Sequence, residues 1–426
     1  MKIKTKKADY EKVISMPKQK HKNPRKPLWL LKLLIRILAI PDLFSTKFTY
    51  TEHNMDKLGD EPCLILMNHS SFIDLKIASK IFFKRPYNIV CTSDGFVGKE
   101  LLMRLIGCIP TQKFVTDVHL ISDINYALKE LKTSVLMYPE ASYSFDGTAT
   151  TLPRKLGVLL KRLGVPVVTV ITDGAFLRDP LYNNLQLRKT KVSAKVTCLF
   201  TKEDLKSKST KELDKLLDEA FSFDNFAAQY ENKVEIKEGF RADGLSRILY
   251  KCSDCGVEGK MEGKGTKLVC HNCGKTFELT TLGRLSAENG ETKFPHIPDW
   301  YSWQREEVKK EIEEGTYLLD TKVDIGVMVN FKAIYMVGEG RLVHNNEGFK
   351  LTSNDGKIDY SQNPLACYGL YSDYYWYEIA DVICIGNNDI LYYCFPKDCG
   401  DVVAKTRIAT EEMYKINKAR KKLKAE

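Results

Sequence analysis

Cys63 to Met67 form a continuous apolar run, and few folds can bury such a run on every side. A short run with no polar interruption is typical of a strand inside a parallel sheet that is covered on both faces. The run ends abruptly in a polar segment that contains His69 and, five residues later, Asp74. In open α/β sheets, ligands and chemistry collect where the strands end. The sequence therefore predicts a functional site directly after this strand.

His69 and Asp74 can face each other only if the chain bends between them, because a spacing of five turns the second side chain of a regular helix away from the first. We expect His69 in the loop and Asp74 in the first turn of the next helix. Asp74 would then accept one ring N–H and leave the other nitrogen as a base for an alcohol. Ser71-x-x-Asp74 also fits a capping box, which needs no chemistry, and the two interpretations are compatible.

Strands and helices alternate over residues 49–235. After the first strand, the pattern predicts strands at 87–91, 134–138, 165–172 and 192–200, and helices near 72–83, 97–106 and 154–163. This alternation predicts an α/β fold with a mostly parallel sheet flanked by helices.

Four blocks of residues follow one another through this region. They are Asn68-His69-x4-Asp74, then Gly107 to Lys113, then Pro139-Glu140-Ala141-Ser142-Tyr143 followed by Lys155-Leu156-Gly157, and finally Val165-Pro166-Val167-Val168. Their order and spacing resemble the glycerolipid acyltransferases, the PlsC-like family that includes lysophosphatidate and glycerol-3-phosphate acyltransferases. The resemblance implies an acyltransferase-like fold over about half of the chain.

The resemblance also implies roles for single residues. His69 would take the proton from an acceptor hydroxyl, Asp74 would orient it, and the hydroxyl would attack a fatty acyl thioester of acyl-CoA or acyl-ACP. The acceptor, a lysophospholipid or glycerol phosphate such as 1-acyl-glycerol-3-phosphate, would be bound by the residues of the second and third blocks: Lys113, Glu140, Ser142 and Lys155.

Three of these residues also have plain structural interpretations: a solvated loop charge for Lys113, a bracing carboxylate for Glu140 and a turn residue for Ser142. Tyr143 stands where the family has Arg, which removes a cation and leaves the identity of the acceptor open. A binding protein with a lapsed acyltransferase fold, which recruits a partner through its other domains, is the alternative function.

Two Cys-x2-Cys pairs, each followed by glycine, occur at 252–256 and 270–274. The short spacing lets both sulfurs of a pair reach one ion, and four thiolates complete a tetrahedral structural zinc site. The sequence therefore predicts a zinc ribbon over 245–285, with Cys252, Cys255, Cys270 and Cys273 as ligands and an unknown protein as its partner.

Residues 1–48 contain thirteen Lys or Arg and three acidic residues, so this segment carries the whole net charge of +10. The neutral remainder argues against a nucleic-acid partner. Pro27 and Pro41 bracket an apolar helix that is too short to cross a bilayer. With its basic leader it resembles a helix that lies in an anionic membrane surface, and the alternative is a helix packed on the protein's own core. We expect a cytoplasmic protein that is peripheral on the inner face of the membrane.

Beyond residue 294, a charged helix over 300–314 is followed by short strands, tyrosine-rich segments and a basic helix in the last twenty residues. This pattern predicts a small β-rich α+β domain over 295–426. No family resemblance indicates its role.

Overall fold

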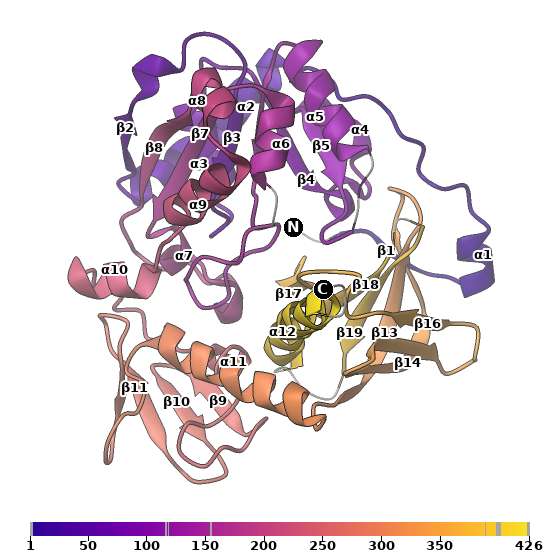
Figure 1. Cartoon of the computed structure of the whole chain (residues 1–426). Coiled ribbons are helices and arrows are strands. Elements are labelled where there is room, and N and C mark those ends of the chain that lie inside the picture. The colour runs from indigo at the N-terminus through magenta and orange to yellow at the C-terminus, as the bar shows by residue number, and fades with distance from the viewer. Residues whose placement is uncertain are drawn as a thin grey trace.

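The computed structural model describes residues 3–115, 117, 119–153, 156–387, 389–397 and 402–423. Its strands form three sheets, of seven, four and eight strands (Figure 1). The seven-stranded sheet lies at the top of the view, the four-stranded sheet at the lower left, and the eight-stranded sheet at the lower right. Lys155 of the predicted acceptor site lies outside the described residues.

The seven-stranded sheet has the order β2-β8-β7-β3-β6-β4-β5, and its neighbours are parallel except for β7 and β8. Its strands are β2 (Thr49–His53), β3 (Leu64–Met67), β4 (Tyr87–Thr92), β5 (Cys108–Thr111), β6 (Ser134–Met137), β7 (Val167–Asp173) and β8 (Ser193–Phe200). The central strand β3 is buried on both faces: Ile65 and Met67 face one hydrophobic core, and Leu64 and Leu66 face another. The predicted α/β class is confirmed, and burial on both faces explains why β3 has no polar residue.

Helices cover both faces of this sheet. They are α2 (Trp29–Ser45), α3 (Asp74–Ile81), α4 (Glu100–Leu105), α5 (Leu120–Lys129), α6 (Leu156–Leu163), α7 (Ala175–Arg178), α8 (Lys202–Ser207) and α9 (Thr210–Ala220). The next helix, α10 (Asn225–Glu231), packs elsewhere, since its Phe226 belongs to the hydrophobic core that also contains Trp300. Residues of α2 and α3 belong to the core on the Ile65 side, and residues of α5, α6 and α9 belong to the core on the Leu64 side. The loop after β3 therefore opens at the carboxyl edge of a sheet that helices hold on both sides.

The helix α2 runs four residues beyond Pro41, where the sequence predicts its end. Proline removes one helical hydrogen bond, but the last turn is held by other contacts. Leu43 is buried, and the Thr46 hydroxyl donates to the Asp42 carbonyl oxygen at 2.8 Å. Among the described residues, no helix has both the length and the hydrophobicity needed to cross a bilayer.

The four-stranded sheet is antiparallel and consists of β9 (Met261–Lys264), β10 (Lys267–Cys270), β11 (Thr276–Leu279) and β12 (Leu285–Ala287). The helix α11 (Ile297–Glu314) follows it and leads into the C-terminal sheet. That sheet has the order β16-β15-β14-β13-β19-β18-β17. Its strands are β13 (Leu319–Met328), β14 (Ile334–Asn345), β15 (Gly348–Ser353), β16 (Asp359–Gln362), β17 (Tyr371–Trp376), β18 (Ala380–Gly386) and β19 (Leu391–Pro396).

The eighth strand of the C-terminal sheet comes from the other end of the chain. The strand β1 (Thr5–Lys7) pairs in parallel with β14, and the short helix α1 (Tyr10–Ile14) follows it. Val13 of α1 is fully buried in the same hydrophobic core as Val323 and Tyr392. The basic leader is therefore built into the β-rich C-terminal sheet.

The last helix, α12 (Val402–Leu423), lies near the middle of the molecule, beside α11 and β17 and below the seven-stranded sheet (Figure 1). One hydrophobic core contains Phe145 and Phe176 of the acyltransferase-like region, Phe277 of the four-stranded sheet, and Trp300 and Tyr374 of the C-terminal region. This shared core fixes the C-terminal region against the edge of the seven-stranded sheet where the strands end.

Candidate active site

The loop after β3 brings His69 and Asp74 together. The His69 Nδ1 atom lies 3.0 Å from Asp74 Oδ2, and Asp74 is the first residue of α3. The bend between them is fixed by Asn68, whose amide oxygen accepts from the Thr172 backbone N–H at 2.8 Å and from its hydroxyl at 3.0 Å. Because Asn68 is tied to the neighbouring strand β7, the chain turns directly after β3 and the predicted pair is formed.

Asp74 is buried, and its Oδ2 atom lies within hydrogen-bond distance of three donors. Besides the His69 ring, the backbone N–H groups of Ser70 and Ser71 donate to Oδ2 at 3.0 and 3.2 Å. Burial raises the pKa of Asp74 to about 8, although the two N–H groups act against this rise. The predicted capping box is only half formed, because the Ser71 hydroxyl accepts from the Ile73 N–H at 3.3 Å and not from the Asp74 N–H.

Two tyrosines enclose the ring of His69. Tyr138 stacks on it with a centroid distance of 4.0 Å, and Tyr143 stacks with a centroid distance of 3.7 Å. The His69 side chain is 15% exposed, and none of its hydrogen bonds to described residues involves Nε2. Burial and the charge of Lys113 hold the pKa of His69 well below its usual value, so the ring is neutral. A neutral ring whose Nδ1–H is engaged presents an unprotonated Nε2.

Glu140 braces the loop beside His69. Its Oε2 accepts from the His69 backbone N–H at 2.9 Å, and its Oε1 accepts from the Thr150 N–H and hydroxyl at 2.9 and 3.0 Å. Burial raises the pKa of Glu140 to about 7. Because protein donors engage both oxygens, the geometry agrees with the bracing interpretation, and acceptor binding by Glu140 stays a prediction.

The next residue, Ala141, has φ +56°, a left-handed conformation that residues with a Cβ rarely adopt. It belongs to the third of the four blocks described above. Hydrogen bonds from the last helix, α12, hold the loop in this conformation.

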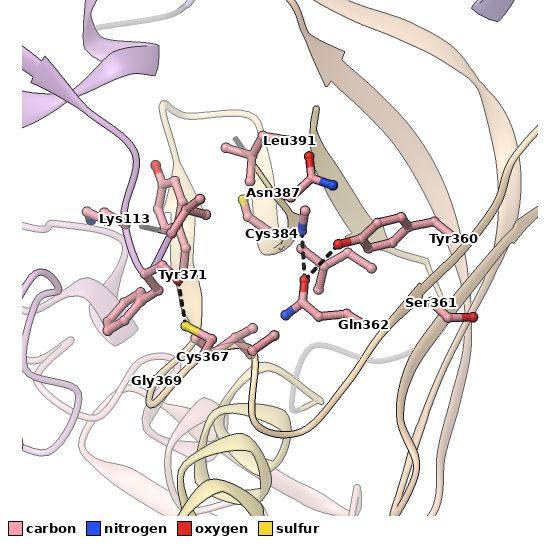
Figure 2. Close-up of a pocket in the computed structure, with 16 residues that line it drawn as sticks. Lys113, Tyr360, Ser361, Gln362, Cys367, Gly369, Tyr371, Cys384, Asn387 and Leu391 are labelled. Atoms are coloured by element: carbon pink, nitrogen blue, oxygen red, sulfur yellow. Dashed lines mark hydrogen bonds between the residues drawn. The ribbon is translucent and has the colours of Figure 1, made fainter. Parts of the chain in front are cut away.

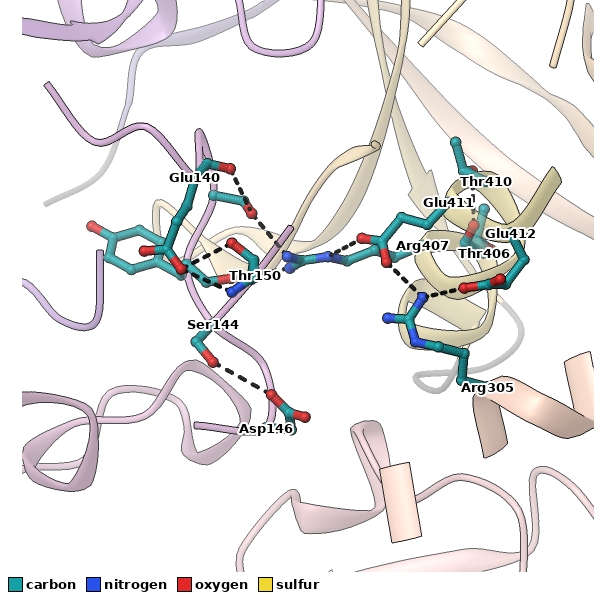
Figure 3. A network of polar contacts seen from close by, with 12 residues as sticks. Glu140, Ser144, Asp146, Thr150, Arg305, Thr406, Arg407, Thr410, Glu411 and Glu412 are labelled. Atoms are coloured by element: carbon teal, nitrogen blue, oxygen red, sulfur yellow. Dashed lines mark hydrogen bonds and ion pairs between the residues drawn. The ribbon is translucent and has the colours of Figure 1, made fainter. Parts of the chain in front are cut away.

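Arg407 of α12 donates these hydrogen bonds (Figure 3). Its Nη2 donates to the Ser142 hydroxyl at 2.9 Å, and its Nη1 donates to the Tyr143 carbonyl oxygen at 3.0 Å. Arg407 also pairs with Glu411 at 3.3 Å, and Arg305 of α11 pairs with that same carboxylate at 2.8 Å. Ser142, a predicted substrate-binding residue, thus accepts a hydrogen bond from the C-terminal helix.

Lys113, the remaining described residue predicted to bind the acceptor, faces the C-terminal sheet. Its Nζ lies 3.7 Å from Asp373 Oδ2 and 4.5 Å from the ring centroid of Tyr371, both on β17. The sequence reasoning did not identify Asp373, Tyr371 or Arg407 as site residues. The dense tyrosines of 371–377 were the only local signal, and they fit an ordinary β-rich core equally well.

The four predicted ligand cysteines, Cys252, Cys255, Cys270 and Cys273, come together at one end of the four-stranded sheet. All four sulfurs lie within 4.8 Å of one another. Gly256 and Gly274 have φ +72° and +76°, and this left-handed turn lets each N–H donate to the carbonyl of the first cysteine of its pair. Four sulfurs at this separation fit a single tetrahedral metal ion.

Comparison with known proteins gives a match over the region that contains His69 and Asp74. Residues 49–173 match the family model described as acyltransferase. This part of the chain is therefore acyltransferase-like, and the resemblance seen in the sequence is confirmed there.

Among solved structures, the 1-acyl-sn-glycerophosphate (LPA) acyltransferase PlsC from Thermotoga maritima is similar to the chain. The sequences are 17% identical, the TM-score is 0.37, and the match covers 45% of this chain and 76% of that chain. Comparison with curated protein sequences gives no match.

Proposed function

We propose that this protein transfers a fatty acyl group from a thioester carrier to a hydroxyl of a glycerolipid precursor, with His69 as the general base. The observation that carries the proposal is the 3.0 Å contact between His69 Nδ1 and Asp74 Oδ2, made inside the acyltransferase-like region. This contact leaves Nε2 as the basic nitrogen at the carboxyl end of a parallel strand.

The reaction needs no covalent enzyme intermediate, because a thioester is already activated. The acceptor oxygen gives its proton to His69 Nε2 and bonds to the thioester carbonyl carbon. The carbon–sulfur bond then breaks, and the departing thiolate takes the proton from Nε2. Asp74 holds the ring orientation and stabilises the imidazolium that forms.

The donor is acyl-CoA or acyl-ACP, and the family resemblance implies a lysophospholipid or glycerol phosphate, such as 1-acyl-glycerol-3-phosphate, as the acceptor. An assay with the full chain, an acyl-CoA and several lyso-acceptors tests the proposal by measuring the free thiol and the acylated lipid. We expect thiol release that depends on the acceptor. Thioester cleavage that is absent with every acceptor, for both carriers, would instead support a lapsed acyltransferase fold that serves as a binding protein.

We also propose that α2 holds the enzyme on an anionic membrane surface. One face of the helix points outward and is apolar: Leu30, Leu34, Ile37, Leu38 and Phe44 are 48 to 85% exposed. Ala39 and Leu43 on the opposite face are buried. The alternative of a helix that turns its charges outward does not fit this arrangement, and an apolar face of this size beside a basic leader suits a lipid surface.

Replacing Leu30 with glutamate is expected to weaken binding to phosphatidylglycerol vesicles by at least about tenfold, because the insertion of one leucine contributes about 1.5–3 kcal/mol. Cosedimentation with vesicles measures the change. Leu423→Glu is the control, since Leu423 is 75% exposed at the end of α12, away from α2. Equal binding of both variants and the parent would remove α2 from the membrane contact.

The cysteine cluster is proposed to hold a structural Zn²⁺ ion, since four thiolates complete the coordination shell and leave no open position for chemistry. We expect about one zinc per purified chain and almost none after Cys270→Ser, because three thiolates bind far more weakly. Elemental analysis measures the zinc content directly. Cys198→Ser, at another buried cysteine, should keep its zinc, and a zinc-free parent protein would contradict the proposal.

A further inference from the structure

The C-terminal sheet places a carboxylate where the acyltransferase-like region offers its cation. Asp373 and Lys113 pair at 3.7 Å, and their side chains are only 9 and 10% exposed. The Lys113 ammonium also lies above the ring of Tyr371 and 5.8 Å from the ring centroid of Tyr143. Since Tyr143 is one of the two tyrosines that stack on His69, Lys113 and Asp373 lie close to the His69–Asp74 pair.

The charges around Lys113 do not favour a phosphate. Asp94 also lies here and accepts hydrogen bonds from Tyr371 and, at 3.5 Å, from Tyr377. Two further cations lie near this cluster among the described residues. Ser142, Tyr143 and Glu411 already engage Arg407. Lys99, whose Nζ lies 6.0 Å from the ring centroid of Tyr377, interacts electrostatically with Asp94. A phosphate bound at Lys113 would therefore compete with Asp373 for the charge of Lys113, since Arg407 and Lys99 already interact with other acidic groups.

Asp373 has an unused acceptor atom. Its Oδ2 faces Lys113, whereas Oδ1 is buried and has no hydrogen-bond partner among the described residues. A buried carboxylate oxygen without a donor is unfavourable, so the site is incomplete as it stands. A hydroxyl group of a ligand would supply the missing donor, and a phosphate at neutral pH would not.

Space for such a ligand lies next to Lys113. A cavity of about 280 Å³ lies between the loop that carries Lys113 and the C-terminal sheet, close to the lower end of the size range of small-molecule sites (Figure 2). Its walls include Phe114 and Val115 on one side and Gln362 and Cys384 on the other. Lys113 is the only charged residue among the described residues that line it. Asp373 does not itself line the cavity, but it pairs with Lys113, so the cavity suits an uncharged polar group.

We infer that Asp373 determines acceptor specificity and that the acceptor is a lipid alcohol with an uncharged headgroup, of the monoacylglycerol class, and not a phosphomonoester. The inference rests on the proposed acyl transfer and narrows its acceptor. The C-terminal sheet is then the half of the active site that selects the acceptor. In the related family an arginine of the third block would bind the acceptor phosphate, and Tyr143 stands at that position here. The C-terminal sheet would take over the selection of the acceptor.

The test compares 1-monoacylglycerol with 1-acyl-glycerol-3-phosphate of the same chain length, using the full chain and one acyl-CoA. We expect kcat/KM of the parent protein to favour monoacylglycerol by at least about tenfold. Asp373→Asn keeps the shape of the side chain but frees Lys113, so the ratio should shift towards the phosphate by at least about tenfold. Asp359→Asn on the exposed edge strand β16 is the control and should leave the ratio unchanged.

Lys113→Met provides an independent test of the inference if Asp373→Asn does not fold. We expect this variant to keep its preference for monoacylglycerol, whereas selective loss of activity on the phosphate would show that Lys113 binds phosphate and would overturn the inference. A parent protein that prefers the phosphate, or an unchanged ratio in Asp373→Asn, would also overturn it. Acylation of neither acceptor is a different result, because it contradicts the proposed function itself.

Discussion

Replacement of His69 by glutamine is expected to lower kcat/KM for acyl transfer by about 10²- to 10⁴-fold, the usual contribution of a general base. Glutamine can still donate a hydrogen bond to Asp74, but it has no nitrogen that can accept the acceptor proton at neutral pH. Thiol release from acyl-CoA, measured with a saturating acceptor, gives the rate. His271→Gln is the matched control, because His271 is exposed beside the cysteine cluster, where it contacts Glu262.

The same assay run against pH separates a base from a merely structural histidine. While Asp74 is protonated, its Oδ2 can still accept from Nδ1–H, but the carboxyl carries no charge to stabilise the imidazolium that forms when Nε2 takes the proton. Because the pKa of Asp74 is raised to about 8, kcat/KM should rise with pH up to about 8 and level off above it. His69 stays unprotonated through this range, since its own pKa is lowered. Full activity in His69→Gln, or a rate that falls as the pH rises towards 8, would contradict the assignment.

The parts of the site that the sequence predicts correctly are those formed within one short segment. A short apolar run bounded by polar residues fits an interior strand, so β3 and the loop after it follow from the hydrophobic pattern and its length. The His69–Asp74 contact needs only one bend, and the two cysteine pairs need only one turn each, so residue spacing is enough to predict them.

The parts that the sequence could not predict depend on contacts between distant segments. Nothing in the composition of Thr5–Lys7 indicates that it pairs with β14, because the pairing is set by where the two ends of the chain meet. Arg407 looks like any other basic residue of a basic helix, and its contact with Ser142 spans 265 positions. A proline likewise suggests the end of a helix, but burial of Leu43 carries α2 past Pro41. Tertiary packing decides each of these cases.

Arg407 provides the second large prediction, because it links the C-terminal helix to the loop that encloses His69. We expect Arg407→Met to lower the free energy of unfolding by about 3–5 kcal/mol, as is usual when one partner of a buried ion pair is removed. The Glu411 side chain is mostly buried, and although burial alone would raise its pKa, Arg305 and Arg407 together lower it. Chemical denaturation measures the loss. Arg341→Met, which removes an exposed pair with Asp320, should change stability by no more than about 0.5 kcal/mol.

A loss of stability alone would not show that Arg407 positions the active site, so the kinetic constants of the folded fraction decide this point. Without Arg407, the Ser142 hydroxyl and the Tyr143 carbonyl lose their donor, and Tyr143 is free to move off the ring of His69. We expect kcat to fall by about 10²-fold with a smaller change in KM, because small displacements of a catalytic group have effects of this size. Arg407→Lys keeps the charge but cannot make both hydrogen bonds, so it should restore stability more than kcat.

Ala141 allows an independent check of the same mechanism. Its left-handed backbone conformation, φ +56°, is unfavourable by about 1–2 kcal/mol for a residue with a Cβ and almost free for glycine. If Arg407 acts by holding this loop in place, Ala141→Gly should recover part of the kcat that Arg407→Met loses, because the loop then needs less support. If Arg407 instead acts only through the overall stability of α12, glycine at position 141 leaves kcat unchanged. An Arg407→Met protein that is folded and fully active would mean that the loop holds His69 without the C-terminal helix.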